Sequence, residues 1–353
     1  MDRQFRLALT FDDVLLEPRE SYVTRSQVSL ETKLTKNLTI QIPILSAAMD
    51  TVTHAAMAVS LGRLGGLAIL HRNCSVDTQV QMVKTAKKTG VVVGAAVGPG
   101  DIARALALDK AGVNVLVVDT AHGHNMRALA SAREIKKKIK AQLIVGNIAT
   151  KEAAAELSKF ADAIKVGIGP GSICTTRMVA GIGIPQLTAI IDVARAAKKK
   201  KVPVIADGGM KYSGDIVKAL AAGASAVMLG SMLAGTKEAP GKILNIRGQK
   251  YKSYRGMGSL GAMSSGNSSD RYFQKNTNTY VPEGIEGITR YKGKLEDVVF
   301  QITGGLKSGM GYIGAKSIPE MWKQARFIQI TGAGLKESHP HTVTIIKRSP
   351  NYD

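Results

Sequence analysis

The chain has 353 residues, 44% hydrophobic and 21% charged, which suits one α/β barrel with a large buried core. Two cysteines exclude a disulfide framework, and no apolar run approaches the length of a membrane span. The N-terminal residues also lack the long apolar core of a signal peptide. We therefore expect a soluble cytoplasmic protein with no membrane partner.

The charge is strongly basic, because Lys and Arg exceed Asp and Glu by 48 to 27, a formal net charge of +21. Such a surplus attracts anions, either nucleic acid or phosphorylated small molecules. Lysine runs at 136–140 and 198–201 each precede a predicted strand. We interpret them as helix ends, where cations offset the helix dipole. Without a base-reading motif or an aromatic platform, we expect at most weak, non-specific nucleic-acid binding.

Eight short apolar runs recur along the chain, and each ends in Gly, Asp, Asn or Ser. Continuous apolar runs without alternation are typical of parallel strands buried on both faces. The stretches between them are rich in Ala, Leu and Lys, and many close on Gly, as helix C-termini do. Eight strand–helix units predict a (β/α)8 TIM barrel rather than an open doubly wound sheet. The runs cover residues 42–50, 66–73, 91–98, 113–123, 141–150, 162–171, 202–209 and 225–231.

The segment after the eighth strand, about 240–296, contains no comparable strand–helix unit. A loop of this length in a compact domain is usually functional or disordered. It would lie above the C-terminal face of the barrel, where barrel enzymes keep their sites, so we predict a mobile flap. Residues 297–326 then look helical. We interpret 1–353 as a single catalytic domain.

Cys174 stands in the glycine-rich stretch "GIGPGSICTTR" (167–177), directly after the sixth predicted strand. A thiolate is a nucleophile, and the start of a helix near Thr176 would favour it. The alternative is a buried structural cysteine. The Gly, Pro and Ser neighbours favour the nucleophile. Cys74 lacks such a loop, and we expect it to be inert.

Glycines follow the seventh and eighth strands, as "DGG" (207–209) and "GS" (230–231). Barrels often bind phosphate at these two positions through backbone N–H groups. The alternative is that the glycines serve only tight turns. Asp207 would avoid a phosphate because it is acidic, and a ribose diol suits it better.

Two further segments carry candidate polar residues. Asp119 ends the fourth strand and suits the hydroxyls of a second ribose. His122 and His124 follow it, but two His without an acidic partner are a weak metal signal, and stacking or hydrogen bonding fits them better. In the flap, Arg271 and Tyr272 are either a surface pair or a pair that activates water.

Taken in order, several long motifs resemble the bacterial type of inosine-5′-monophosphate (IMP) dehydrogenase family. The resemblance runs from "LTFDDVLLEP" to "LKESHPH", and its motifs are "DTAHGH", "GIGPGSICTTR", "DGG", "YRGMGSLGAM", "SSDRYFQ" and "VPEGIEG". It implies NAD-dependent oxidation of IMP to xanthosine monophosphate. Cys174 would attack carbon 2 of the purine, and Arg271, helped by Tyr272 and Thr176, would activate water for hydrolysis.

The resemblance also implies ligand contacts and a homotetramer. For the substrate, the phosphate would lie on Ser172, Gly209, Gly230, Ser231 and Tyr254, the ribose on Asp207, and the purine near Met257, Gly258 and Glu283, with Ser46 and Gly256 adjoining. The cofactor would contact Asp119, Thr120, His122, Asn147 and Gly167. K⁺ would bind the carbonyls of Gly167, Gly169 and Cys174, completed by Glu337, Ser338 and His339 of a neighbouring subunit.

The sequence departs from the family in one respect. The family usually carries a pair of regulatory CBS modules after the second strand, and this insertion is absent near 80–91. Guanosine monophosphate reductase, a sister family of similar length, also lacks these modules. That family lacks the flap Arg–Tyr pair, however, so Arg271 and Tyr272 favour the dehydrogenase.

Overall fold

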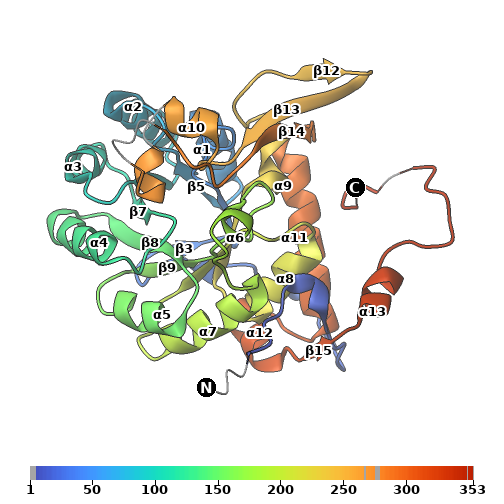
Figure 1. Ribbon diagram of the computed structural model, residues 1–353. Helices are drawn as coiled ribbons and strands as arrows, with labels where there is room; N and C mark the ends of the chain where they lie inside the picture. Colours follow the sequence, from blue (N-terminus) through green and yellow to red (C-terminus); the bar gives the residue numbers. More distant parts are fainter. Residues whose placement is uncertain (1–4, 266–267, 275–278, 348, 353) are drawn as a thin grey trace.

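The fold is a closed barrel, seen in a computed structural model that describes residues 5–265, 268–274, 279–347 and 349–352 (Figure 1). Eight parallel strands close in the order β10-β11-β4-β5-β6-β7-β8-β9. Each strand falls within one of the eight predicted runs, so the predicted (β/α)8 barrel is confirmed. The strands are β4 (Ile44–Ser46), β5 (Leu67–Leu70), β6 (Val93–Val97), β7 (Val115–Asp119), β8 (Gln142–Ile148), β9 (Ala163–Val166), β10 (Val204–Asp207) and β11 (Ala226–Leu229).

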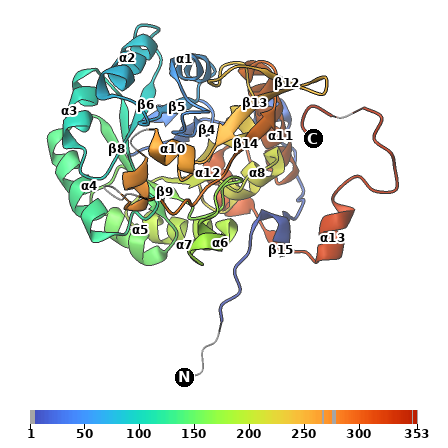
Figure 2. The same ribbon diagram turned by 45° about the horizontal axis from the view of Figure 1, so that its top comes forward.

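Helices form a ring outside the strands, which Figure 2 shows from nearer the barrel axis. The lysine runs end α4 and α7, as predicted, and thus lie at the face where the strands begin. Two short helices, α6 (Thr176–Val179) and α9 (Ser231–Ala234), sit in the loops after β9 and β11. The remaining barrel helices are α1 (Ala55–Arg63), α2 (Val76–Lys87), α3 (Ile102–Lys110), α4 (Met126–Lys138), α5 (Lys151–Leu157), α7 (Gln186–Lys198), α8 (Ser213–Ala221) and α11 (Leu295–Tyr312).

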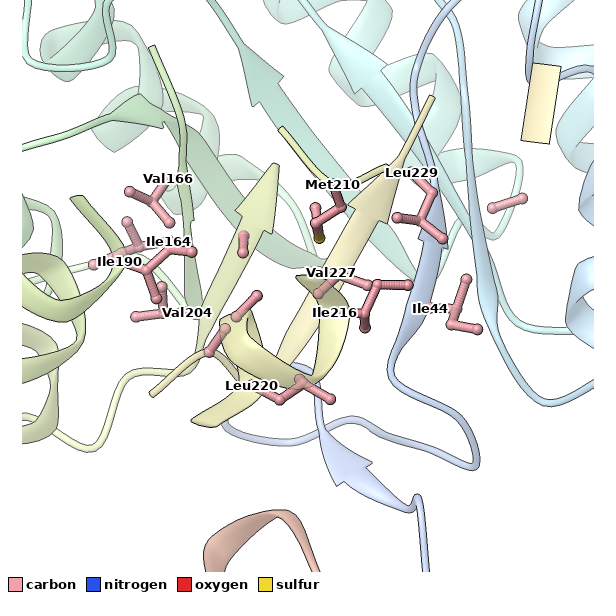
Figure 3. Packing of buried hydrophobic residues seen from close by; sticks show 14 of the residues in the cluster. Ile44, Ile164, Val166, Ile190, Val204, Met210, Ile216, Leu220, Val227 and Leu229 are labelled. Carbon is pink, nitrogen blue, oxygen red and sulfur yellow. The ribbon is translucent and has the colours of Figure 1, made fainter. Parts of the chain in front are cut away.

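Alternate strand residues enter two separate cores. Leu67 and Ile69 of β5 point into the barrel, whereas Ala68 and Leu70 pack in the layer beneath the helices. Figure 3 shows part of this outer layer, where side chains of β9, β10 and β11 meet α7 and α8. Both faces of each strand are therefore apolar, which explains the unbroken apolar runs in the sequence.

A hairpin closes the barrel at the end where its strands begin. It consists of β2 (Thr32–Lys33) and β3 (Thr39–Ile40), and its Leu34 and Ile40 belong to the inner core. This end is filled by side chains, and a cavity lies at the opposite end, where the strands finish.

The segment after β11 is more ordered than a flap without secondary structure would be. It holds a three-stranded antiparallel sheet, β12 (Leu244–Ile246), β13 (Gln249–Arg255) and β14 (Glu286–Arg290), then α10 (Leu260–Ser264) and the 3-10 helix η3 (Ser269–Tyr272). Figures 1 and 2 show α10 lying across the end of the barrel. We refer to residues 256–285 as the flap and to the sheet as the arm.

The arm is fastened to the barrel by Lys252, which is 2% exposed. Its ammonium donates hydrogen bonds to the carbonyls of Thr236, at 3.1 Å, and Ala239. Arg255, three residues later, pairs with Asp50 after β4 at 2.6 Å. These two contacts anchor the sheet at its base.

Two short strands, one near each end of the chain, pair at the side of the barrel. β1 (Val14–Leu16) pairs antiparallel with β15 (Phe327–Gln329), and α13 (Gly332–Glu337) leads into a tail that loops outward and returns, so that the ring of Tyr352 stacks on that of Tyr212 at 5.6 Å (Figure 1). The predicted helical stretch holds α11 and α12 (Ile318–Gln324). The remaining elements are η1 (Phe11–Asp13) and η2 (Arg25–Gln27). Within the described ranges, no helix has the length and apolarity needed to cross a bilayer.

Candidate active site

A cavity of about 370 Å³ opens at the end of the barrel where the strands finish. Its walls come from the loops after the strands and from the flap, so segments far apart in sequence converge there. Most of the predicted site residues line it. They are Asp119, Asn147, Gly167, Gly169, Ser172, Cys174, Thr176, Asp207, Gly209, Gly230, Ser231, Tyr254, Gly256, Met257, Arg271, Tyr272 and Glu283.

Cys174 is held by the flap on one side and by α6 on the other. Its Sγ lies 3.2 Å from Oγ1 of Thr176, the first residue of α6. The backbone pairs with the flap, because Thr175 N–H donates to Glu283 O at 3.0 Å and Ile285 N–H to Ile173 O at 3.0 Å. The thiol is half-buried and faces the cavity. The loop and the flap therefore fix the position of this thiol at the cavity wall.

The other cysteine has a different environment. Burial raises the pKa of the Cys74 thiol, which disfavours its reactive thiolate. Cys74 does not line the cavity. Both observations agree with the prediction that it is inert.

The floor of the cavity carries a buried lysine that the sequence analysis did not single out. Lys165 of β9 is 1% exposed, and its Nζ lies 3.0 Å from Asp119 and 2.5 Å from Asp207. It also donates to Asn147, whose amide donates to Gly167 O at 2.6 Å. One cation therefore connects the two carboxylates that were predicted for two different riboses.

Arg271 of the flap contacts the hydrogen-bonded network around Lys165 through Asp119. Its Nη1 donates to Oδ2 of Asp119, and its backbone carbonyl accepts a hydrogen bond from Ala121 N–H at 3.1 Å. Burial lowers the pKa of Arg271 and raises the pKa of Tyr272 beside it. Burial therefore disfavours the charged form of Arg271, whereas the carboxylate of Asp119 favours it.

Hydroxyl groups and glycines also line the cavity, at Ser172, Gly209, Gly230 and Tyr254. Tyr254 of the arm hydrogen-bonds Ser172, and burial raises the pKa of the phenol to about 12. At Gly230 an added Cβ would lie 2.7 Å from the Tyr254 hydroxyl, so only glycine leaves room there. Gly209 has a φ of 85°, a conformation that favours glycine. These donors and glycines give the geometry that phosphate sites use.

Four of the residues predicted to contact substrate or cofactor do not line the cavity in this conformation. Ser46 is fully buried and accepts a hydrogen bond from Thr53 at 2.8 Å. Thr120 is buried beside the carbonyl of Arg271, and Gly258 packs against the Tyr272 ring. His122 is exposed, and its ring meets that of His124 edge-on at 6.4 Å.

The loop carbonyls suit a monovalent cation. Among the described residues, no hydrogen bond ends on the carbonyl oxygens of Gly169 or Cys174, whereas Gly167 O accepts one from Asn147. Two of the three expected K⁺ ligands are therefore free, and carbonyl oxygens are the ligands that K⁺ prefers. Glu337 and Ser338 belong to the α13 region, and the ring of His339 lies 6.1 Å from that of Tyr212.

No cluster of three or more His, Cys, Asp or Glu side chains suited to a metal occurs in the part of the chain described. The pair His122 and His124 therefore has no third ligand of this kind.

The fold and cavity define a class: a barrel enzyme whose cavity is lined by a loop cysteine, Cys174, and by Arg271 and Tyr272 of the flap. Comparison with known proteins is more specific. Residues 8–341 match the family described as IMP dehydrogenase / GMP reductase domain, and the chain belongs to this family.

Three relatives carry the name inosine-5′-monophosphate dehydrogenase. The protein from Cryptosporidium parvum is 49% identical, over 98% of this chain and 97% of its own. The Helicobacter pylori protein is 41% identical over 99% of both chains, and that of Methanocaldococcus jannaschii is 41% identical over 98% and 97%.

The relatives differ from this chain by an internal insertion. The alignment with the H. pylori protein spans 479 positions, although this chain has 353 residues. Because both chains are covered almost end to end, the extra residues lie inside that relative. In this chain α2 alone connects β5 to β6, with no inserted domain between them.

Proposed function

We propose that this chain is an oxidoreductase that oxidises IMP to xanthosine 5′-monophosphate with NAD⁺, a reaction of guanine nucleotide biosynthesis. The observation that carries the proposal is that one cavity holds both Cys174 and the flap pair Arg271 and Tyr272. A nucleophile and a separate base are what a two-step reaction through a covalent intermediate requires. The names of the relatives support the same substrate.

The substrate would be held by its phosphate, ribose and base. Ser172, Gly209, Gly230, Ser231 and Tyr254 would bind the phosphate, and Asp207 the ribose hydroxyls. Gly256, Met257, Gly258 and Glu283 would contact the purine, with Ser46 beneath it. The hydrogen bond between Tyr254 and Ser172 supports the phosphate assignment, because both hydroxyls converge on the same wall.

The first half-reaction would use Cys174. Its Sγ loses a proton and forms a bond to carbon 2 of the purine. The hydride on carbon 2 then leaves, which gives a covalent thioimidate. NAD⁺ supplies the hydride acceptor when it is bound. Thr176, 3.2 Å from Sγ, would orient the sulfur during this step.

The second half-reaction would use the flap. Water adds to carbon 2 while Arg271 accepts its proton, the carbon–sulfur bond breaks, and the Cys174 thiolate is released with the product. The pKa of Arg271, which burial lowers, supports this role as a base. The phenol of Tyr272 would assist the proton transfer.

The cofactor would share Asp119 with the flap. Asp119, Thr120 and Asn147 would face the nicotinamide riboside, with Gly167 adjoining and His122 near the adenine. In this conformation Arg271 already bonds to Asp119. Cofactor and closed flap would therefore exclude each other, and the flap would close only after the nicotinamide has left.

A K⁺ ion would keep the Cys174 loop in shape. Gly167, Gly169 and Cys174 would supply carbonyl oxygens, and Glu337, Ser338 and His339 of a neighbouring copy would complete the site. The free carbonyls of Gly169 and Cys174 support this. The site needs a second copy of the chain, so we propose a homotetramer of single-domain subunits without CBS modules, located in the cytoplasm.

The main competing activity is reduction of guanosine monophosphate, which the family description also covers. The two reactions differ in hydrolysis, which only the dehydrogenase needs. The position of Arg271 and Tyr272 in the cavity therefore favours the dehydrogenase. Protein mixed with IMP, NAD⁺ and K⁺ should produce NADH, read from its absorbance. Cys174→Ser should abolish the signal. Turnover of guanosine monophosphate with NADPH, but none of IMP, would overturn the proposal.

The charge of +21 leaves weak nucleic-acid binding as a secondary expectation. Binding to random DNA should be measurable only at low salt, because it would rest on phosphate contacts alone. Affinity that persists at physiological salt would instead indicate a genuine nucleic-acid function. This measurement is independent of the NADH assay.

A further inference from the structure

A second arginine–carboxylate pair joins the barrel to the flap outside the cavity. Arg72 follows β5 and is 5% exposed, and Asp270 belongs to η3. Nη1 of Arg72 donates to Oδ2 of Asp270 at 3.0 Å, and Nη2 lies 2.7 Å from Oδ1. The guanidinium thus lies against both carboxylate oxygens, and the contact between Nη1 and Oδ2 has the geometry of a charge-assisted hydrogen bond.

This pair occupies space that a glycine leaves open. An added Cβ at Gly98, just after β6, would lie 2.5 Å from Oδ2 of Asp270 and 2.9 Å from Nη1 of Arg72. Gly98 is not among the glycines with positive φ, so its backbone would accept alanine. A side chain at position 98 would therefore collide with the ion pair, and this steric conflict is the reason that glycine fits there.

The pair adjoins the proposed base. Asp270 immediately precedes Arg271, whose Nη1 bonds to Asp119 at the end of β7. Two ion pairs therefore connect η3 to the barrel. In one the arginine, Arg72, belongs to the barrel, and in the other the arginine, Arg271, belongs to the flap. Arg72 and Asp270 do not line the cavity, so they do not meet substrate or cofactor there.

We propose that Arg72 and Asp270, seated over Gly98, are positioning residues that latch the flap closed and thereby hold Arg271 in place for hydrolysis. The proposal rests on the proposed function, because it assigns the latch to the second half-reaction. The charge of Arg72 also acts on its neighbour: after burial, it is a further cause of the lowered pKa of Arg271. The latch thus keeps the charged guanidinium of Arg72 close to Arg271, the group that must lose a proton before it can act as a base.

The latch would act differently on the two half-reactions. The first requires the cofactor at Asp119 and hence an open flap, and the second requires the closed flap. Weakening the latch shifts the equilibrium towards the open state. Hydride transfer should then be retained, hydrolysis should slow, and the cofactor should compete better for Asp119.

The experiment uses Arg72→Gln and Asp270→Asn in the full-length enzyme, measured with IMP, NAD⁺ and K⁺. We expect the rapid NADH burst to remain within about twofold, and steady turnover to fall about tenfold, as loss of a charge-assisted hydrogen bond predicts. The covalent adduct on Cys174 should accumulate, read by intact-protein mass, and the KM for NAD⁺ should fall. Arg72→Lys, which keeps the charge, should restore part of the turnover.

Two further variants sharpen the test. The double variant R72Q/D270N should be no slower than either single variant, because both remove the same interaction. Gly98→Ala should give the same pattern by displacing the pair. Its control is Gly214→Ala, where an added Cβ meets nothing within 4 Å. Arg104→Gln, which breaks a buried pair with Asp101 away from the flap, controls for general destabilisation.

The latch would be overturned if the NADH burst and the steady turnover fell by the same factor in the single variants. It would also be overturned if the effects of R72Q and D270N on turnover were additive in the double variant, or if Gly98→Ala left turnover unchanged. If the wild-type protein produces no NADH, the proposed function fails instead. In that case the latch can still be tested by a measurement that does not depend on catalytic activity. Hydrogen exchange of the backbone amides at 268–273 should rise in R72Q and D270N and remain unchanged in R104Q. Unchanged exchange in the two latch variants would reject the latch on its own.

Discussion

The ammonium of Lys165 lies 2.5 Å from the carboxylate of Asp207, deep in the barrel and almost fully shielded from water. The same ammonium lies 3.0 Å from Asp119. Two acidic groups with separate proposed ligands therefore share one counter-ion. A change at Lys165 should be felt at both ligand sites.

Replacing this lysine should weaken both ligands at once. Lys165→Met removes this cation from both carboxylates, and Asp119 keeps only Arg271, which costs about 3 kcal/mol of stability for a broken buried pair. We expect the KM for IMP and the KM for NAD⁺ each to rise about tenfold, with a lower thermal midpoint. Lys159→Met, on an exposed lysine, is the matched control. A change in only one of the two KM values would contradict a shared role.

Removal of the proposed base should separate the two half-reactions. In Arg271→Ala the NADH burst should persist, while steady turnover falls on the order of a thousandfold, as loss of a general base predicts. Stopped-flow absorbance measures both quantities. Arg127→Ala, an exposed arginine outside the cavity, should change neither. Equal losses of burst and turnover would remove Arg271 from a role confined to hydrolysis.

The phosphate assignment predicts an effect on binding rather than on chemistry. Tyr254→Phe removes a hydroxyl that would contact a non-reacting group, so the KM for IMP should rise about tenfold with little change in kcat. With the pKa of Tyr254 at about 12, the phenol stays protonated and this KM should not vary from pH 7 to about pH 9 on its account. Tyr251→Phe is the control, because Tyr251 lies on the same strand and bonds to Gln249 outside the cavity.

A buried histidine predicts how stability depends on pH. His71 is 2% exposed, and burial, followed by the charge of stacked His54, lowers its pKa from 6.5 to about 4. Its Nδ1 accepts a hydrogen bond from Asn73 N–H at 3.1 Å, which also opposes protonation. Between these two values the unfolded chain binds more protons than the folded one. The contribution of His71 is therefore complete above about pH 6.5 and is lost as the pH falls towards about 4.

The size of that loss is about 3 kcal/mol, which denaturant unfolding at several pH values would measure. His71→Phe keeps an aromatic ring against His54 but cannot titrate, so its profile should be flatter over this range. His341→Phe, at an exposed histidine, should leave the profile unchanged. A steep profile in H71F would assign the acid sensitivity to other groups.

The sequence predicted the barrel well because each strand is apolar on both faces. The runs around β5 and β7 are unbroken, and helices end at Gly or Lys between them. The arm was missed because its strands are exposed and charged. In "QKYKSYR" the buried positions are Lys252 and Tyr254, and a lysine on the inner face conceals the alternation of a strand.

The candidate site was predictable where a motif carries the chemistry, as around Cys174. Its pairings were not. Asp119 and Arg271 are 152 positions apart, and Arg72 and Asp270 are 198 apart. Only the closed barrel brings such residues together. Lys165 gave one usable signal, a charged residue inside the apolar run "AIKV", which a buried strand tolerates only with partners.

The anchored base of the arm limits how much of the chain has to move. Lys252 is tied to the carbonyls of Thr236 and Ala239, and Arg255 to Asp50, so the sheet turns with the barrel as one body. Opening of the flap would then be confined to residues 256–285, which lie between β13 and β14. A shorter moving segment loses less chain entropy each time it closes, so two ion pairs at η3 suffice to hold it. Loosening Lys252 would lengthen the hinge and make every closure entropically costlier without altering a single group in the cavity.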